Sequence, residues 1–461
     1  MSVDGVRTDR NLGSSGIRHG DGPSITPSRL GFIVFAFLAA PLLLLIRFWR
    51  TNSWGYRHWL LTAFVTAYGS TIAIRYDSTG QGADGVRHLL LVYEHYVGMT
   101  FEQFIVDLWN TLTLQSSSHP GVRDPYKHIV SYFVGGVLQM PWLFFTLIAF
   151  VYGYFFSGSM LFIFRNYELS KVNYIVLAFA VLLLLVKNVE GVNTVRTWTG
   201  LWVLVYGTLR YYETKKLKYI LLMFLSPFIH FAYWVMILPA IVVLIFGNRI
   251  LVYSVLFVLS SFTTFLQPQV MTEALSSNEI GERSVESYYL EQRIEIEDVL
   301  RQSEGQRWYR VFQRIGVQKW GLNILIYTLL ATGVYFSLMT PLQKSMFSTG
   351  LLTLTLGNST WFLFALSNRS WIIGCVFVLS AFIMWRTNPR TKRFSLGEKA
   401  QYYRYGINLS LLFFAPYILY NLSTLLDYPS LFVFLMPFVV WLDPELNMSI
   451  KYALQVLLGL R

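Results

Sequence analysis

The chain has 461 residues, of which 54% are hydrophobic and 13% are charged. A soluble domain carries roughly a quarter charged residues, whereas apolar runs near the ~20 residues that cross a bilayer recur throughout this chain. The sequence therefore excludes an ordinary soluble protein and predicts an all-α fold, a polytopic helical bundle with about 12–14 membrane segments. The net charge of +12 lies mostly in short loops, which is typical of topology signals and not of nucleic-acid binding.

The amino-terminal stretch 1–29 is polar and rich in Gly and Ser. It has no apolar core, so we expect a disordered tail and no cleavable signal peptide. The membrane domain is predicted to cover 30–461. A single cysteine, Cys375, rules out an internal disulfide.

Apolar runs that could cross a membrane follow one another along this domain. The predicted segments are 30–48, 57–76, 140–164, 171–187, 195–211, 218–246, 250–266, 319–339, 345–366, 369–385, 404–422 and 429–441.

Two strongly basic loops set the orientation, YYETKKLK at 211–218 and the stretch at 386–404. The positive-inside rule places both in the cytoplasm. An odd number of crossings between them would put them on opposite faces, so 218–246 should enter the membrane and return. We expect a broken hairpin that turns near His230, because Pro227 removes a helical hydrogen bond.

This topology puts the amino terminus and two long regions, 77–139 and 267–318, on the outer face. Loops 47–57 and 165–171 fall inside. The stretch HLLLVYEHYVGMTFEQFIVDLW at 88–109 alternates apolar and polar residues with a helical period. It predicts an amphipathic helix at the outer membrane interface.

Several ionisable side chains fall on this predicted outer face. Guanidinium groups form paired, charge-assisted hydrogen bonds with phosphate oxygens. Arginines at segment ends, with His and Asp nearby, therefore favour a phosphate or diphosphate site. The candidates are Asp84, Arg87, Glu190, Asn193, Arg196, His230 and Arg369.

Most of these candidates also have a structural interpretation, and for Glu190 it is a solvated loop residue. His230 could be a neutral histidine that bridges two helices, although ionisable residues at membrane depth usually have a function. Arg196 and Arg369 could extend to the interface as anchors, and Asp84 could pair with Arg87 on one helix face.

Motifs of several well-known enzyme classes are absent. The sequence has no P-loop, no H-E-x-x-H and no G-x-S-x-G. It also has no D-x-D metal site on the predicted outer face. We therefore expect any chemistry to need no metal and no cofactor.

Three stretches together resemble one family. The resemblance lies in GADGVRHLLLVYEHY, in DPYKHIVSYFVGGVL and in NTVRTWTG, which leads on to SPFIHFAYW. Through these stretches the chain resembles the EpsG-like family of exopolysaccharide polymerases, which are relatives of the Wzy-type O-antigen and capsule polymerases. The resemblance covers 77–246, and Arg369 in SNR resembles a later arginine of such proteins. The tail and the acidic 267–318 region depart from the family, which leaves the sugar substrate open.

The resemblance implies a membrane glycosyltransferase at the outer face of the bacterial inner membrane. It would transfer a glycan from undecaprenyl diphosphate onto a lipid-linked repeat unit. Arg196 and Arg369, with Arg87 beside them, would bind the diphosphate, and His230 or Asp84 would accept the proton. The implied partners are the lipid-linked oligosaccharide, the bilayer, a chain-length regulator and a flippase.

Two other functions stay open. A transporter of lipid-linked oligosaccharides would be expected to show paired broken helices in inverted repeats, and the sequence has one such segment. A membrane acyltransferase would take its acyl donor from the cytoplasm, with its histidine near that face.

Overall fold

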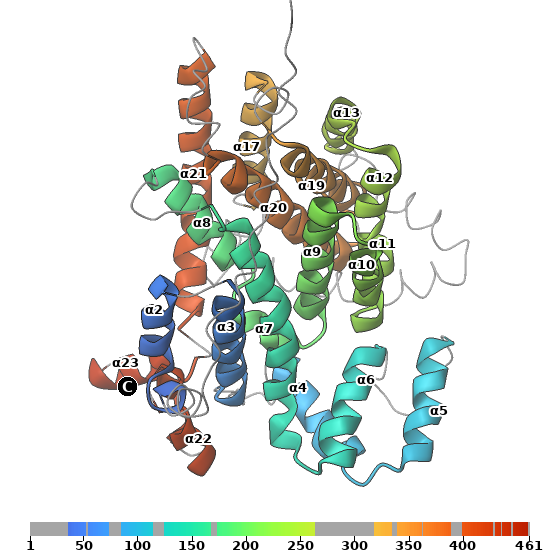
Figure 1. The fold of residues 1–461 in the computed structure, drawn as a ribbon, viewed down its shortest axis with the longest axis vertical. Helices are drawn as coiled ribbons and strands as arrows, with labels where there is room; N and C mark the ends of the chain where they lie inside the picture. Colours follow the sequence, from blue (N-terminus) through green and yellow to red (C-terminus); the bar gives the residue numbers. More distant parts are fainter. Residues whose placement is uncertain are drawn as a thin grey trace, which may run out of the picture.

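A computed structural model describes residues 36–51, 54–72, 84–113, 124–166, 173–262, 318–333, 339–361, 363–388, 399–426, 429–434, 436–443 and 446–459. These residues are helical, with no β-strand among them (Figure 1). Among its α-helices are α2 (Pro41–Thr51), α3 (Trp54–Ser70), α4 (Asp84–Leu91), α5 (Phe101–Leu112), α6 (Pro125–Tyr132), α7 (Phe144–Ile163), α8 (Tyr174–Val186), α9 (Thr197–Thr214), α10 (Leu217–Ile229), α11 (Tyr233–Met236), α12 (Leu238–Phe246), α13 (Ile250–Ser260), α17 (Gln318–Thr332), α19 (Pro341–Ser359), α20 (Phe364–Arg386), α21 (Lys399–Thr424), α22 (Phe438–Leu442) and α23 (Ile450–Leu457).

Three helical stretches of the described chain are long and apolar enough to cross a membrane. They are Pro141–Ile163, Tyr174–Thr194 and Ala365–Arg386. They indicate that the protein associates with a membrane. Other predicted segments, among them 250–266 and 319–339, contain shorter apolar helices. The tail 1–29 and the region 267–318 lie outside the described residues.

The helix break expected near His230 is present. Helix α10 continues through Pro227 and ends at Ile229, and His230 has an extended backbone with φ −152°. Helices α11 and α12 follow. The break therefore comes three residues after the proline, where the chain turns toward the site described below.

The single amphipathic helix expected over 88–109 is wrong. The chain is helical up to Tyr96, then Gly98 adopts a positive φ of 84°, which glycine does at little cost. Thr100 and Gln103 form a capping box that starts α5. The exposed face of α5 is nevertheless apolar, as predicted for an interfacial helix: Phe101, Ile105, Val106, Trp109 and Leu112.

The continuous helix expected over 429–441 is also wrong. The structure has a short 3-10 turn at Leu431–Val433 and the five-residue helix α22. Pro437 lies between them, and a proline within a helix removes a backbone hydrogen bond. Hydrophobicity alone predicted a segment that the proline interrupts.

Small residues let neighbouring helices approach closely. A Cβ on Gly69 of α3 would lie 2.2 Å from the Ala149 Cβ of α7. A Cβ on Gly374 of α20 would lie 2.6 Å from Leu354 of α19. Such contacts are typical of helix pairs that pack within membranes.

Helix ends that carry the predicted inner loops meet at one end of the bundle. Arg165, after α7, forms an ion pair with Glu213 near the end of α9. Tyr212 and Thr349 share a hydrogen bond of 2.6 Å, which ties this end of α9 to α19. Helices α4, α5 and α6 lie at the opposite end, beyond the start of α9 and the end of α10 (Figure 1).

Candidate functional site

A strained turn places Arg196 at the start of α9. Val195 has φ 56° and ψ −64°, and the Arg196 amide donates to the Thr194 carbonyl at 2.6 Å. This is a γ-turn of the rare strained kind, which costs roughly 1–3 kcal/mol. Val195 is fully buried, and its carbonyl accepts a hydrogen bond from the Thr199 hydroxyl at 2.6 Å. The surrounding packing therefore holds the turn.

Asp124 joins Arg196 and His230. It directly precedes α6 but makes no side-chain capping bond. Its carboxylate instead forms an ion pair with Arg196, accepts from the Phe231 amide at 2.8 Å and lies 3.1 Å from His230 Nδ1. Asp124 is 1% exposed, so the carboxylate at the centre of this contact between three chain segments is shielded from water.

The Asp124 carboxylate stays ionised in this position. Burial alone would raise its pKa, but the hydrogen bond from His230, the charge of Arg196 and the Phe231 amide together lower the pKa below its usual range. The carboxylate is therefore an acceptor at physiological pH.

His230 is buried at the helix break, with 6% of its surface exposed. Its Nδ1 faces Asp124, whereas its Nε2 is buried with no hydrogen-bond partner among the described residues. A buried polar atom without a partner is costly. Such an atom is a candidate contact for a ligand.

Two more of the predicted arginines belong to this neighbourhood. Arg369 acts electrostatically on His230 and on Tyr233. It lies in the second turn of α20, because that helix begins at Phe364 and not at Arg369 as expected. Arg87 lies on α4 and is exposed.

The remaining candidates lie beside this group. Asp84 is the first residue of α4, and its side chain is outside the described part of the structure. Glu190 and Asn193 belong to the 3-10 turn Val189–Thr194 that precedes Arg196. A Cβ on Gly85 would lie 1.9 Å from Asn193 Oδ1, so α4 packs directly on this turn.

The sequence analysis missed His88 and Lys127, which are each 4% exposed. Burial, and then the positive charges of Lys127, Arg196 and Arg87, lower the pKa of His88 to about 2. His88 is therefore neutral at physiological pH. Three cations and the Asp124 carboxylate act on His88, so positive charges outnumber the negative one around it, which favours an anionic ligand.

We expect His88 to make stability fall in mild acid. The unfolded chain takes up a proton near pH 6.5, which folded His88 accepts only near pH 2. Between pH 7 and pH 5 the free energy of unfolding should therefore fall by about 2 kcal/mol because of this residue. His88→Gln cannot titrate, so its melting temperature in detergent should fall less over that interval than that of the unmodified protein. Equal pH dependence in both proteins would show that His88 titrates normally.

Asp124 was also missed as a site residue, although the stretch DPYKHIV was noted. An acid followed by proline at the start of a helix favours a capping role. Its three partners come from segments 72 to 107 residues away in sequence. The one feature of the sequence that could have indicated Asp124 as a site residue is the position of its carboxylate directly before a mostly apolar helix.

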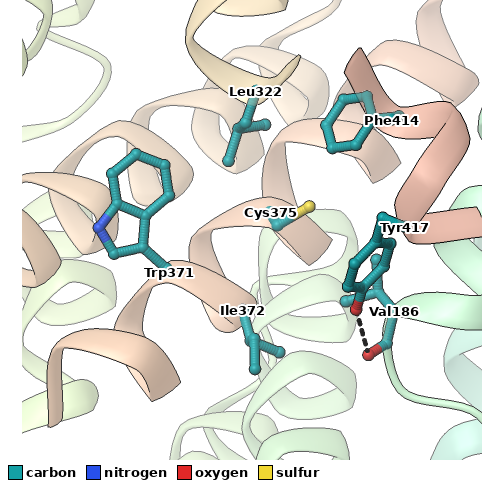
Figure 2. Close-up of a pocket in the computed structure, with 7 residues that line it drawn as sticks. All are labelled: Val186, Leu322, Trp371, Ile372, Cys375, Phe414 and Tyr417. Atoms are coloured by element: carbon teal, nitrogen blue, oxygen red, sulfur yellow. Dashed lines mark hydrogen bonds between the residues drawn. The ribbon is translucent and has the colours of Figure 1, made fainter. Parts of the chain in front are cut away.

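A separate pocket lies between α8, α17, α20 and α21 (Figure 2). Within it, the Tyr417 hydroxyl donates to the Val186 carbonyl at 3.3 Å. None of the charged residues of the Asp124 group lines it. The lining residues are Val186, Leu322, Trp371, Ile372, Cys375, Phe414 and Tyr417.

Within the described ranges, no group of three His, Cys, Asp or Glu side chains could hold a metal ion. The chain matches no known family model, no curated protein and no solved structure. The candidate site is therefore interpreted from its own geometry.

Proposed function

We propose that the protein is a polysaccharide polymerase of the EpsG-like kind. It transfers a glycan from a lipid diphosphate onto a lipid-linked repeat unit at the outer face of the bacterial inner membrane. The observation that carries this proposal is the group in which Asp124 joins Arg196 to His230, with Arg369 in electrostatic range. It combines cations for a leaving diphosphate with a buried nitrogen that has no hydrogen-bond partner in the described part of the chain.

The reaction is a displacement at the anomeric carbon of the donor glycan. The hydroxyl oxygen of the acceptor sugar bonds to that carbon while its proton passes to His230 Nε2. The bond from the carbon to the diphosphate oxygen breaks, and the electron pair leaves with undecaprenyl diphosphate. Arg196 and Arg369 stabilise the negative charge that grows on the leaving group. Arg87 contributes to the same potential.

Asp84 is retained as a second candidate for the proton acceptor, because it starts the helix that carries Arg87 and His88. We propose that 218–246 is a broken membrane hairpin in a polytopic bundle, with its turn at the outer face. Support comes from the helix break at His230 and from the meeting of the predicted inner loops at the opposite end.

Cysteine labelling tests this topology. In a Cys375→Ser background, single cysteines are placed at Ser276 and Thr391, in the predicted outer and inner loops. A membrane-impermeant maleimide added to intact spheroplasts should label the first and spare the second. The reverse pattern would place His230 on the cytoplasmic side and favour an acyltransferase.

The function itself is tested by reconstitution. Purified protein in liposomes is incubated with a lipid-diphosphate-linked repeat unit, and the products are separated on a gel. A ladder of lengthening glycans, with release of the lipid diphosphate, is the expected result. Movement of the unchanged oligosaccharide across the bilayer without a ladder would instead identify a transporter.

A further inference from the structure

We propose that Asp124 is a positioning residue that fixes which nitrogen of His230 is available to the acceptor. It holds the proton on Nδ1 and leaves the lone pair on Nε2. This inference rests on the proposed function for its catalytic meaning. The protonation state that it predicts is measured independently of any glycan.

The hydrogen-bond inventory of the carboxylate supports the assignment. One Asp124 oxygen, Oδ1, accepts from the Phe231 amide at 2.8 Å and faces His230 Nδ1 at 3.1 Å. The other, Oδ2, forms the ion pair with Arg196. An ionised carboxylate can only accept hydrogen bonds. The proton between Asp124 and the ring therefore belongs to Nδ1.

Charge balance supports a neutral ring. Asp124 brings one negative charge and Arg196 already brings one positive charge to it. A second proton on His230 would add a buried positive charge within reach of Arg369. Burying an uncompensated charge is expensive. The Nε2 atom is buried and has no hydrogen-bond partner among the residues that the structure describes, and it then carries a lone pair.

Hydrogen bonds hold the backbone in place at His230. The His230 amide donates to the Ser226 carbonyl at 3.0 Å, and the next amide, of Phe231, donates to the same carboxylate that holds Nδ1. The ring also packs against Tyr233, with centroids 6.2 Å apart. Rotation of the ring would break its bond to Asp124 while the backbone stayed in place.

Through its contacts with Arg196 and His230, Asp124 also links the binding of the leaving group to the activation of the acceptor in the proposed reaction. Arg196 belongs to the leaving diphosphate and His230 to the attacking hydroxyl, and one rigid carboxylate sets both positions. Asp124 itself has no exposed surface to offer a substrate, since it is 1% exposed. It acts through its two neighbours, and substitution should therefore alter both.

Nitrogen-15 NMR of histidine-labelled protein in nanodiscs reads the ring directly. The chain has seven histidines, and the His230→Gln variant assigns the His230 signal. We expect a neutral ring at pH 7 with its proton on Nδ1. A proton on Nε2, or a doubly protonated ring, in the unmodified protein would overturn the inference, whatever happens with the variants.

The Asp124→Asn variant tests the cause. Its amide can donate as well as accept, so the tautomers of His230 should mix. Polymer per folded protein should fall about 10²–10⁴-fold, the range for loss of a correctly held general base. Asp107→Asn is the matched control, because Asp107 is also 1% exposed but lies on α5; it should leave the His230 spectrum unchanged. An unaltered tautomer in Asp124→Asn would show that Asp124 does not set it.

The two proposals fail separately. If the unmodified protein makes polymer but its His230 carries the proton on Nε2, the positioning role is wrong and the proposed function stands. If the proton is on Nδ1 but no ladder forms, the geometry is right and the proposed function is wrong.

Discussion

Arg196→Ala should strongly reduce polymer formation and also lower the melting temperature. Loss of a charge-assisted hydrogen bond to the diphosphate costs roughly 1.5–3 kcal/mol, which is about ten- to a hundredfold in rate. The substitution also leaves the buried Asp124 carboxylate without its main cation. Breaking a buried ion pair costs roughly 3–5 kcal/mol. Because the Arg196 side chain is 23% exposed, the lower end of that range applies.

Two further variants separate these effects. Arg196→Lys keeps the positive charge beside Asp124 but lacks the planar fork of the guanidinium, so stability should largely return while polymer formation stays impaired. Arg165→Ala removes the ion pair between Arg165 and Glu213 at the opposite end of the helix bundle. The Arg165 side chain is 29% exposed and the Glu213 side chain is 27% exposed. An exposed pair contributes little, so this control should behave as the unmodified protein. Near-normal polymer from Arg196→Ala would reduce Arg196 to a structural partner of Asp124.

His230→Gln should keep the fold and lose turnover. The glutamine amide can still donate to Asp124, but it cannot accept a proton as a base. A general base contributes roughly 10²–10⁴ in rate, so polymer per folded protein should fall by that factor. The measurement is polymer formed by detergent-extracted protein, normalised to the folded fraction, beside its melting temperature.

His128 supplies the matched control. It is 1% exposed, and both of its ring nitrogens are bonded, Nδ1 to the Tyr96 hydroxyl at 2.9 Å and Nε2 to the Phe104 carbonyl at 3.0 Å. His128→Gln should therefore lower the melting temperature without changing turnover of the folded protein. If His230→Gln keeps more than about a third of the normal turnover, His230 is not the base, and Asp84 is the next residue to test.

The sequence predicted part of the site because its rarest residues stand out in an apolar chain. An arginine at a helix start and a histidine within an apolar segment are costly at membrane depth, and Arg196 and His230 do meet through Asp124. Asp124 was not predicted, because Asp-Pro before a helix already has a local explanation as a cap. Its actual bonds depend on packing between distant segments, which residue spacing does not show.

The fold follows the same division. Helices were predicted where apolar composition is continuous, and the break at His230 was expected from its proline and its length. Composition predicted continuous helices over 88–109 and 429–441, and both predictions were wrong. A glycine with positive φ interrupts the first helix and a proline interrupts the second. These are single-residue conformational effects within stretches whose average hydrophobicity does not change.

The separation of Asp124 from its partners has a consequence for synthesis of the chain. His230 follows Asp124 by 106 residues, so at 5–20 residues per second roughly 5–20 s pass before the ribosome has supplied both. The carboxylate lacks its cation until Arg196 is made, 72 residues after Asp124, and it lacks its imidazole until His230 is made. A nascent chain stalled before Arg196 should leave α6 open to added protease, and one stalled well beyond His230 should protect it. Helix α6 thus waits for α9 and α10 before it can dock.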